Sequence, residues 1–156
     1  MTLNIQAADL NEPAIRHLIN THISYGEAAY PAESNHHLSA DDHIAIEVAL
    51  FAPWEGDSCL GMLGIMKLSA TTAEIKSMHV LEAGRGRGVG AALLGYIIDK
   101  AQAEGVTTLF LETGSRDASA AARRLYERSG FVYCPPFGDY ASDPESVFVA
   151  LHLSKT

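Results

Sequence analysis

The sequence predicts an α/β (α+β) fold: a mixed, largely antiparallel sheet of about seven strands with a central parallel pair, flanked by about four helices. Three observations lead to this expectation. Three extended segments follow one another between residues 44 and 80, a helical period spans residues 89–103, and that helix connects a strand at 72–80 with another at 108–113. A helical crossover places two strands parallel. With 156 residues, the chain is expected to form one domain, residues 1–156.

The N-terminal part is expected to begin with a short strand at residues 3–7, followed by a helix. Asp9 or Asn11 stands near the helix cap and Pro13 in the first turn, which are favoured positions for these residue types. The helix itself is indicated by apolar residues at three- and four-residue spacing: Ile15, Leu18, Ile19 and Ile23. The polar segment 25–42 has no convincing period, so it predicts an ordered loop or short irregular helices.

Three strands are expected next, as an antiparallel meander. The first is indicated by large apolar residues at every second position: Ile44, Ile46, Val48 and Leu50. Pro53 and the EGD sequence at 55–57 predict a turn into the second strand, at residues 59–68, and the third strand follows at 72–80. Short connections of this kind favour antiparallel pairing.

The C-terminal part is expected to contain two helices and three strands. The first helix, which Gly105 closes, is indicated by Val89, Leu93, Leu94, Ile97, Ile98 and Ala101. The strand TLFLET after it is nearly all apolar, as is typical of a buried strand with a parallel neighbour. Asp117 or Ser119 caps the second helix. The segments FVY and SVFVALHL are expected to be the last two strands.

Composition excludes several classes of protein. The net charge of −8 argues against a nucleic-acid partner, because such proteins carry a basic face that neutralises phosphates. No apolar run is long enough to span a bilayer and no basic-then-apolar leader precedes the first strand, so neither a membrane partner nor export is expected. Cys59 and Cys134 have no CxxC or Cys/His spacing, which fits the reducing cytoplasm.

Basic residues are concentrated in one part of the chain. Residues 1–74 contain two basic and ten acidic side chains, residues 75–130 contain eight and six, and residues 131–156 contain one and three. The middle part is therefore the only net-positive one, at +2 (8 − 6). A local positive field there suits an anionic ligand, and the acidic remainder suits a cationic one. An uneven surface without function explains the counts equally well.

The middle part contains the glycine-rich segment AGRGRGVGAALL, residues 83–94. Such segments are often simple turns. Here the glycines lead into a helix, whose first N–H groups lack an intrahelical acceptor and carry the positive end of the helix dipole. Glycines let an anion approach these groups, so the segment predicts a pyrophosphate site. Arg85 and Arg87 add charge at its rim or remain solvated.

Two motifs in this part carry a family resemblance. Residues 85–90, RGRGVG, match the pattern R/Q-x-x-G-x-G/A, and residues 125–131, LYERSGF, match LYxxxGF. In this order, separated by one helix and one strand, they resemble the signatures of the GCN5-related N-acetyltransferases (the GNAT family), and the layout of the chain resembles their fold. The tail FGDYASDPESVF and the segment YPAESNHHL further resemble a bacterial subgroup of the family.

The resemblance implies an N-acetyltransferase that uses acetyl-CoA and no metal. Its pyrophosphate would be held by main-chain N–H groups of Arg85, Gly86, Arg87, Gly88, Val89 and Gly90. Met78, His79 and Val80 would pair their main chain with the pantetheine arm, and one of these amides would donate to the thioester oxygen. Tyr126 matches the residue that protonates the departing thiolate. Ser119 stands where many relatives have asparagine, so a side-chain contact to the coenzyme stays open there.

We expect the amine of a small molecule, such as an amino acid or a similar compound, to attack the thioester directly in a ternary complex. The resemblance implies an acceptor pocket framed by the first helix, the loop after it and the last hairpin. By position, the residues that could contribute to it are Glu33, Ser34, His37, Lys76, Glu112, Phe137, Asp139 and Tyr140. Glu33 and Asp139 would hold a cation, and Lys76 a carboxylate. The proton would be removed by Glu33, His37 or Glu112. Solvated side chains explain each of these residues equally well.

Other interpretations stay open from the sequence. GRGVGA, read from Gly86, also fits the dinucleotide pattern G-x-G-x-x-A, although half the chain precedes it. A non-catalytic acyl-CoA sensor with the same fold would use Tyr126 only as a core aromatic. A metal site is suggested by five residues whose spacing matches no ligand pattern: His36, His37, Asp41, Asp42 and His43. The oligomeric state is expected to be a monomer or a homodimer.

Overall fold

The computed structural model describes residues 2–34 and 37–153. The strands are β1 (Asn4–Ala7), β2 (Ala49–Glu55), β3 (Ser58–Cys59), β4 (Gly61–Lys67), β5 (Thr72–Val80), β6 (Thr108–Gly114), β7 (Val132–Cys134) and β8 (Ser146–His152). The helices are α1 (Pro13–Ala29), α2 (Ala40–Ala45), α3 (Val89–Ala103) and α4 (Ala120–Arg128). Three short 3₁₀ turns lie between them: η1 (Ala32–Ser34), η2 (Glu82–Gly84) and η3 (Asp117–Ser119).

Within the described ranges the strands form one mixed sheet, in the order β1-β2-β4-β5-β6-β8-β7, with β3 paired to β2. Strands β5 and β6 are the parallel pair, and the other pairs are antiparallel. Helix α3 is the crossover between β5 and β6. The predicted fold class is therefore confirmed, including the central parallel pair.

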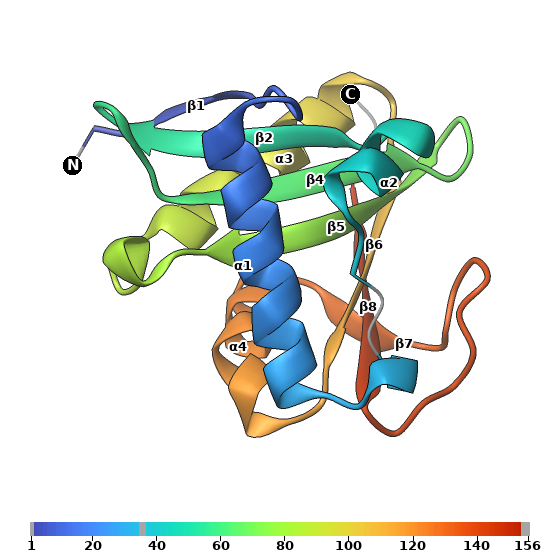
Figure 1. Ribbon diagram of the computed structural model, residues 1–156. Coiled ribbons are helices and arrows are strands. Elements are labelled where there is room, and N and C mark those ends of the chain that lie inside the picture. Colours follow the sequence, from blue (N-terminus) through green and yellow to red (C-terminus); the bar gives the residue numbers. More distant parts are fainter. Residues whose placement is uncertain (1, 35–36, 154–156) are drawn as a thin grey trace.

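Helices cover both faces of the sheet (Figure 1). Helix α1 crosses one face, where Ile15, Leu18 and Ile19 pack with residues of β2 and β4. Helices α3 and α4 lie on the other face, and the larger core there combines their apolar side chains with those of β4, β5, β6 and β8. Burial on both faces is what holds the parallel pair in the centre of the sheet.

Most predicted elements are confirmed. The strand predicted at 72–80 has these bounds in the structure, and the helix after the glycines ends just before Gly105, whose φ of 87° is the left-handed conformation expected at a helix C-terminus. The segments TLFLET and SVFVALHL form β6 and β8. The polar segment after the first helix contains the end of α1, then η1 and the start of α2.

The strand predicted at 44–50 is wrong for most of its length. Helix α2 extends to Ala45 and a turn follows at residues 46–47, because Ser39 and Asp42 form a reciprocal capping box that starts a helix here. Ile44 and Ile46 follow the cap with 47% and 41% of their surface exposed, and β2 begins only at Ala49. The alternation of apolar residues therefore did not mark a strand here. Ile44 lies in α2 and Ile46 is its C-cap, and both side chains face solvent.

The helix caps lie at or next to the predicted positions, but the expected side-chain cap bonds are absent. Helix α1 begins after Glu12, which makes no side-chain cap, whereas the Asp9 carboxylate accepts from the main-chain N–H of Asn11. Ser119 occupies the N-cap position of α4 but makes no cap bond. Its hydroxyl bonds instead to the Tyr30 hydroxyl at the end of α1, with 2.8 Å between the oxygens. Ser119, which was predicted to cap α4, thus connects the start of α4 to the end of α1.

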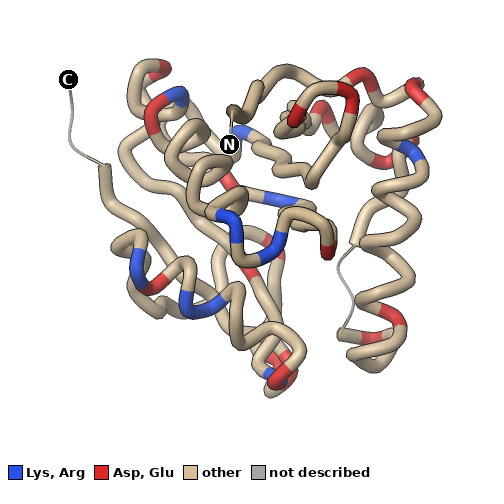
Figure 2. Tube along the Cα trace, turned by 90° about the vertical axis from the view of Figure 1, so that its left-hand side faces the viewer, with Lys and Arg blue, Asp and Glu red and all other residues tan. Residues whose placement is uncertain are grey.

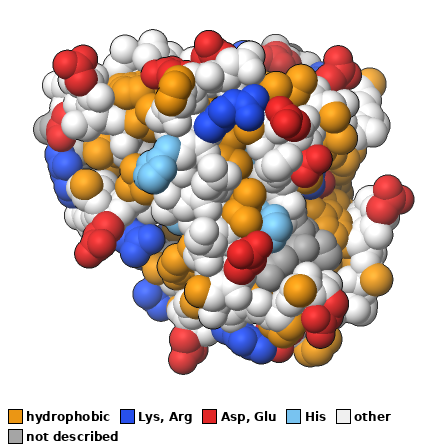
Figure 3. Space-filling model, in the orientation of Figure 1, with side chains coloured by type: hydrophobic (Ala, Val, Ile, Leu, Met, Phe, Trp, Pro, Cys, Tyr) orange, Lys and Arg blue, Asp and Glu red, His pale blue; other side chains and the backbone are white. Residues whose placement is uncertain are grey.

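Charge is divided over the molecule much as the sequence suggests. In Figure 2 the basic segments gather at the centre and lower left, whereas the helix on the right, α1, is flanked mainly by acidic ones. Figure 3 views the α1 face, where acidic and basic side chains are both spread among apolar and uncharged atoms.

Candidate active site

A cavity of about 560 Å³ opens where β5 and β6 separate. The parallel pairing ends at Ile75 and Leu111, because β5 continues along β4 and β6 continues along β8. The walls come from both faces of the sheet: His22 and Tyr25 of α1 on one side, and residues of α3 and α4 on the other. The cavity therefore connects the two faces through the split in the sheet.

The glycine loop forms one end of the cavity. Gly88 is the N-cap of α3, in the left-handed conformation with φ of 78°, and no side chain caps the helix there. The first intrahelical bond runs from the N–H of Ala92 to the carbonyl of Gly88, so the amides of residues 89–91 precede it. Open space surrounds the Cα of Gly88. This end provides main-chain donors and the positive end of a helix dipole to an anion.

The two arginines of the loop differ. Arg85 lines the cavity, donates from Nε to the carbonyl of Val80 over 3.2 Å, and has its guanidinium carbon 5.9 Å from the ring centre of Tyr25. Arg87 turns away and pairs with Glu55, with 2.6 Å between Nη2 and the carboxylate oxygen. Only the first of them is placed to meet a ligand in the cavity with its side chain.

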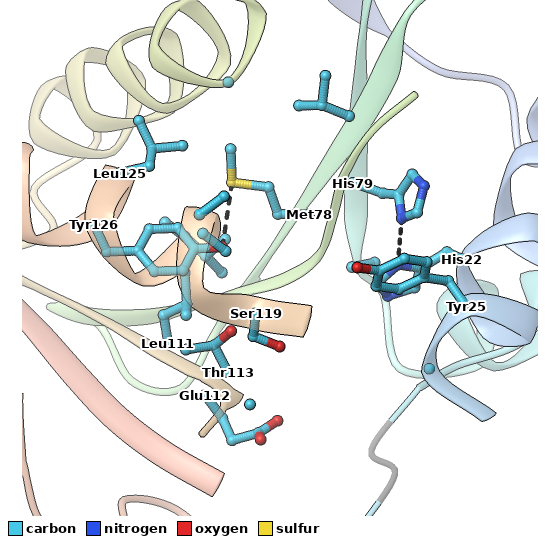
Figure 4. A pocket seen from close by; sticks show the side chains of 18 of the residues that line it. His22, Tyr25, Met78, His79, Leu111, Glu112, Thr113, Ser119, Leu125 and Tyr126 are labelled. Carbon is cyan, nitrogen blue, oxygen red and sulfur yellow. Dashed lines mark hydrogen bonds between the residues drawn. The ribbon is translucent and has the colours of Figure 1, made fainter. Parts of the chain in front are cut away.

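Tyr126 of α4 lines the cavity. Its side chain is 4% exposed and its hydroxyl donates to the thioether sulfur of Met78 over 3.6 Å (Figure 4). Burial raises the pKa of Tyr126 well above its ordinary value, and the nearby Glu112 raises it further. The phenol is therefore protonated at neutral pH. A thioether is a weak acceptor, so this bond is readily exchanged for one to a better acceptor.

A bulge in β5 decides which side chains face each side. The register with β4 shifts between Met62, which is opposite His79, and Gly64, which is opposite Lys76. Within the bulge Ser77 has φ of 57°, and the extra residue reverses the alternation beyond it. Met78 consequently points to Tyr126 and α4, and His79 points to α1, as Figure 4 shows.

A pair of histidines lines the α1 side. The Nδ1 atoms of His22 and His79 are 3.0 Å apart, and the rings meet edge to face. Burial lowers the pKa of His22 to about 4, with a further contribution from His79. Burial, and then the charge of Arg85, also lowers the pKa of His79. Both rings are therefore neutral at pH 7, and one Nδ1 donates to the other.

A polar cluster occupies the opposite end of the cavity. The Tyr140 hydroxyl donates to Glu74 over 2.6 Å, and the Lys76 ammonium lies 3.3 Å from both the Glu74 carboxylate and the Tyr140 hydroxyl. Glu74 is only 3% exposed. Burial and the bond to Glu74 raise the pKa of Tyr140. Lys76, predicted to hold a carboxylate of the acceptor, thus shares its charge with Glu74.

The cavity gathers most of the predicted site residues. Besides those already described, its wall includes Ser34, His37, Val80, Gly86, Val89, Gly90, Glu112 and Ser119. Ser34 donates to Asp143 over 2.7 Å, and His37 lies 3.8 Å from the carboxylate of Glu27.

Four predicted residues do not contribute to the described wall: Glu33, Arg87, Phe137 and Asp139. Phe137 stacks on Phe110 with 4.8 Å between ring centres, in an aromatic cluster beside the cavity. The side chains of Glu33 and Asp139 are exposed. The roles predicted for these four residues stay predictions, because none of the four lines the described cavity.

Two residues of the cavity wall that come from α1 were not predicted from the sequence. His22 and Tyr25 follow Leu18 and Ile19 at helical spacing, so the period placed them near the buried face of that helix, but nothing local connects them with β5. Tyr25 donates to the carbonyl of Ala118 over 2.9 Å and so links α1 to the segment before α4.

The metal cluster considered from the sequence does not assemble among the residues that the structure describes. No group of three His, Cys, Asp or Glu side chains there could hold a metal ion. His43 instead bonds to Ser39 and Ser77, and His36 lies outside the described residues. Within the same ranges, no helix combines the length and apolar character that crossing a membrane would need.

The fold and site together define an acyltransferase: a split parallel pair, a glycine loop at the start of the crossover helix, and a buried tyrosine between them. The chain belongs to the acetyltransferase (GNAT) family, whose model matches residues 13–131. The resemblance seen in the two sequence motifs is thereby confirmed at the level of the family.

Three known proteins illustrate this membership. "Uncharacterized N-acetyltransferase YsnE" of Bacillus subtilis is 36% identical over 97% of this chain and 100% of its own length. "IAA acetyltransferase" of Azospirillum brasilense is 34% identical over 88% and 90% of the two chains. A crystal structure of a GNAT family acetyltransferase from Elizabethkingia anophelis with acetyl-CoA bound shares the fold, with a TM-score of 0.71 at 18% identity over 97% and 98%.

Proposed function

We propose that the protein transfers the acetyl group of acetyl-CoA to the amine of a small molecule, in a ternary complex. The observation that carries this proposal is the cavity itself. One continuous space has main-chain donors at one end, the Tyr126 hydroxyl in its wall and a polar cluster at the other end. Donor and acceptor can therefore meet at the split between β5 and β6.

The coenzyme end follows from the glycine loop. The amides of residues 85–90 would hold the pyrophosphate, and the main chain of residues 78–80 would pair with the pantetheine arm beyond the point where β6 leaves β5. Acetyl-CoA bound in a relative of the same fold supports this coenzyme. The thioester then lies beside Met78, within reach of Tyr126.

The chemistry needs one base and one acid. The amine nitrogen forms a bond to the thioester carbon, a base removes a proton from that nitrogen, and the carbon–sulfur bond breaks as Tyr126 gives its proton to sulfur. Water then restores the Tyr126 proton. Of the bases predicted from the sequence, His37 and Glu112 line the cavity. We propose one of these two, acting directly or through water.

The acceptor end favours a cationic amine. Its wall carries the carboxylates of Glu74 and Glu112 and the ammonium of Lys76. Because Lys76 is paired with Glu74 over 3.3 Å, it attracts a carboxylate on the acceptor less than a free lysine would. Amines without a carboxylate should therefore compete well with amino acids.

The experiment is release of free coenzyme A thiol from acetyl-CoA with a panel of small amines, amino acids and IAA, which appears in the name of a relative. We expect release with at least one member of the panel. Tight binding of acetyl-CoA, measured by calorimetry, without release for any acceptor would instead favour a sensor with this fold.

Three finer assignments accompany this function. The tail FGDYASDPESVF and the segment YPAESNHHL support a bacterial subgroup with the tail pattern GDY-xx-DP-xS-F. Both cysteines are free, which supports a cytoplasmic protein. We keep the expectation of a monomer or a homodimer, which light scattering of the purified protein measures.

A further inference from the structure

His43 is fully buried, and the proposed chemistry does not use it. Its main chain is fixed at both ends, since its N–H donates to the carbonyl of Ser39 over 3.0 Å and its carbonyl accepts from the N–H of Val48 over 2.9 Å. From this rigid base the imidazole reaches across to β5, where Nε2 lies 2.8 Å from the Ser77 hydroxyl. One side chain thus connects α2 to the strand that forms the cavity wall.

The two bonds of the ring determine its tautomer. Nδ1 lies 2.6 Å from the carbonyl oxygen of Ser39, which can only accept, so Nδ1 carries the hydrogen. Burial lowers the pKa of His43, so the ring is neutral and Nε2 has a lone pair. The Ser77 hydroxyl therefore donates to Nε2. The geometry leaves this hydroxyl a single orientation.

Ser77 is the strained residue of the bulge. Its φ of 57° lies in the left-handed region, which residues other than glycine seldom adopt without support from their surroundings. The main-chain N–H of Met78 follows directly. A rotation at Ser77 would turn this N–H and would also change which side of the strand Met78 and His79 face.

We propose that His43 is a positioning residue: through the Ser77 hydroxyl it holds the β5 bulge and so aims the main-chain N–H of residue 78 at the thioester oxygen. The proposal rests on the proposed function, because the thioester is the group that this N–H would meet. His43 touches neither substrate nor coenzyme. It acts on the reaction only through the backbone of Ser77.

The test uses the fact that glycine adopts φ of 57° without strain. His43→Leu removes both bonds, and Ser77→Ala removes the hydroxyl but keeps the strain. We expect each to lower kcat about 10- to 100-fold, because misdirecting a group by about 1 Å has effects of this size. The Kd of acetyl-CoA should change less than about threefold, since the glycine loop is untouched.

Rescue separates positioning from packing. Ser77→Gly should lower kcat less than Ser77→Ala, and the double variant His43→Leu with Ser77→Gly should regain most of the kcat that His43→Leu loses. If His43 only filled space, glycine at position 77 would restore nothing. The matched control is His17→Leu, on the exposed side of α1, with unchanged kcat.

A measurement that needs no enzymatic activity separates this proposal from the proposed function. Nitrogen-15 spectra of the wild-type protein should show His43 neutral with the hydrogen on Nδ1. The amide signal of Met78 should shift in His43→Leu, and in the double variant it should approach its position in Ser77→Gly alone. A hydrogen on Nε2, or an unmoved Met78 signal in folded His43→Leu, would overturn the proposal. Correct spectra in a protein that acetylates no amine would instead contradict the proposed function alone.

Discussion

The two ends of the cavity are built differently. The coenzyme end consists of main chain: the N-cap of α3, the amides after it and the edge of β5 beyond its pairing with β6. The acceptor end consists of side chains from elements far apart in the sequence, such as Glu74 of β5 and Tyr140 of the loop before β8. The coenzyme end depends on backbone conformation and the acceptor end on hydrogen bonds between side chains. Different substitutions should therefore impair the two ends.

The largest effect is expected from Gly88→Val. A β-branched residue is poorly suited to the left-handed conformation at φ of 78°, and its side chain would occupy the open space in front of the helix amides. We expect acetyl-CoA binding, measured by calorimetry, to be lost. Gly95→Ala is the control, because nothing lies within 4 Å of the added carbon inside α3. If Gly88→Val bound the coenzyme normally, the main-chain description of this end would be wrong.

Tyr126→Phe tests the junction of the two ends. It removes only the hydroxyl that donates to Met78, so the fold and the Kd of acetyl-CoA should be retained. We expect kcat to fall about 100-fold, the usual size for loss of a general acid. The exposed Tyr133 on β7 provides the control Tyr133→Phe, with unchanged kcat. Equal kcat for Tyr126→Phe and the wild type would remove this residue from the mechanism.

Gly114→Ala tests a contact in the cavity wall that joins α1 to the start of α4. A Cβ at Gly114 would collide with the Tyr30 ring and hydroxyl and lie 2.5 Å from the Ser119 hydroxyl. The Tyr30–Ser119 bond, which joins α1 to α4, should therefore break. We expect about 3 kcal/mol lower stability in chemical denaturation, in the range of overpacked sites. Stability equal to that of the wild type would contradict this contact between α1 and the start of α4.

The smallest effect is expected from pH. The pKa of His22 falls from 6.5 unfolded to about 4 folded, so the unfolded chain binds more protons in this window. Stability should be fully present above about pH 6.5 and decrease by about 1–3 kcal/mol as the pH falls to about 4. His22→Gln should flatten this decrease in denaturation measured at several pH values, whereas His17→Gln on the exposed side of α1 should not. An equally steep decrease in both variants would contradict the assignment.

The same contrast explains what the sequence could predict. The glycine loop, the helix after it and the strand at 72–80 depend on local patterns, and all three lie where the sequence placed them. The strand predicted at 44–50 failed because a local signal, the Ser39–Asp42 capping box, outweighed the alternation of isoleucines. The pattern S-x-x-D, which is typical of a helix N-terminus, is present in the sequence at residues 39–42.

The acceptor end could not be predicted in the same way. His22 meets His79 from 57 positions away, and Tyr140 meets Glu74 from 66 positions away. These contacts depend on how α1 crosses the sheet and how the last loop folds back, and no short pattern encodes either. The bulge at Ser77 adds a second difficulty, since it exchanges the directions of Met78 and His79 that simple alternation would give.

The central claim is that the diphosphate binds the main chain at the start of α3 and directs the thioester into the split between β5 and β6. A crystal structure of the complex with acetyl-CoA tests it most directly. We expect diphosphate oxygens within hydrogen-bond distance of the amides of residues 85–90 and the thioester sulfur beside the Tyr126 hydroxyl. Coenzyme bound elsewhere, with the glycine loop empty, would contradict it.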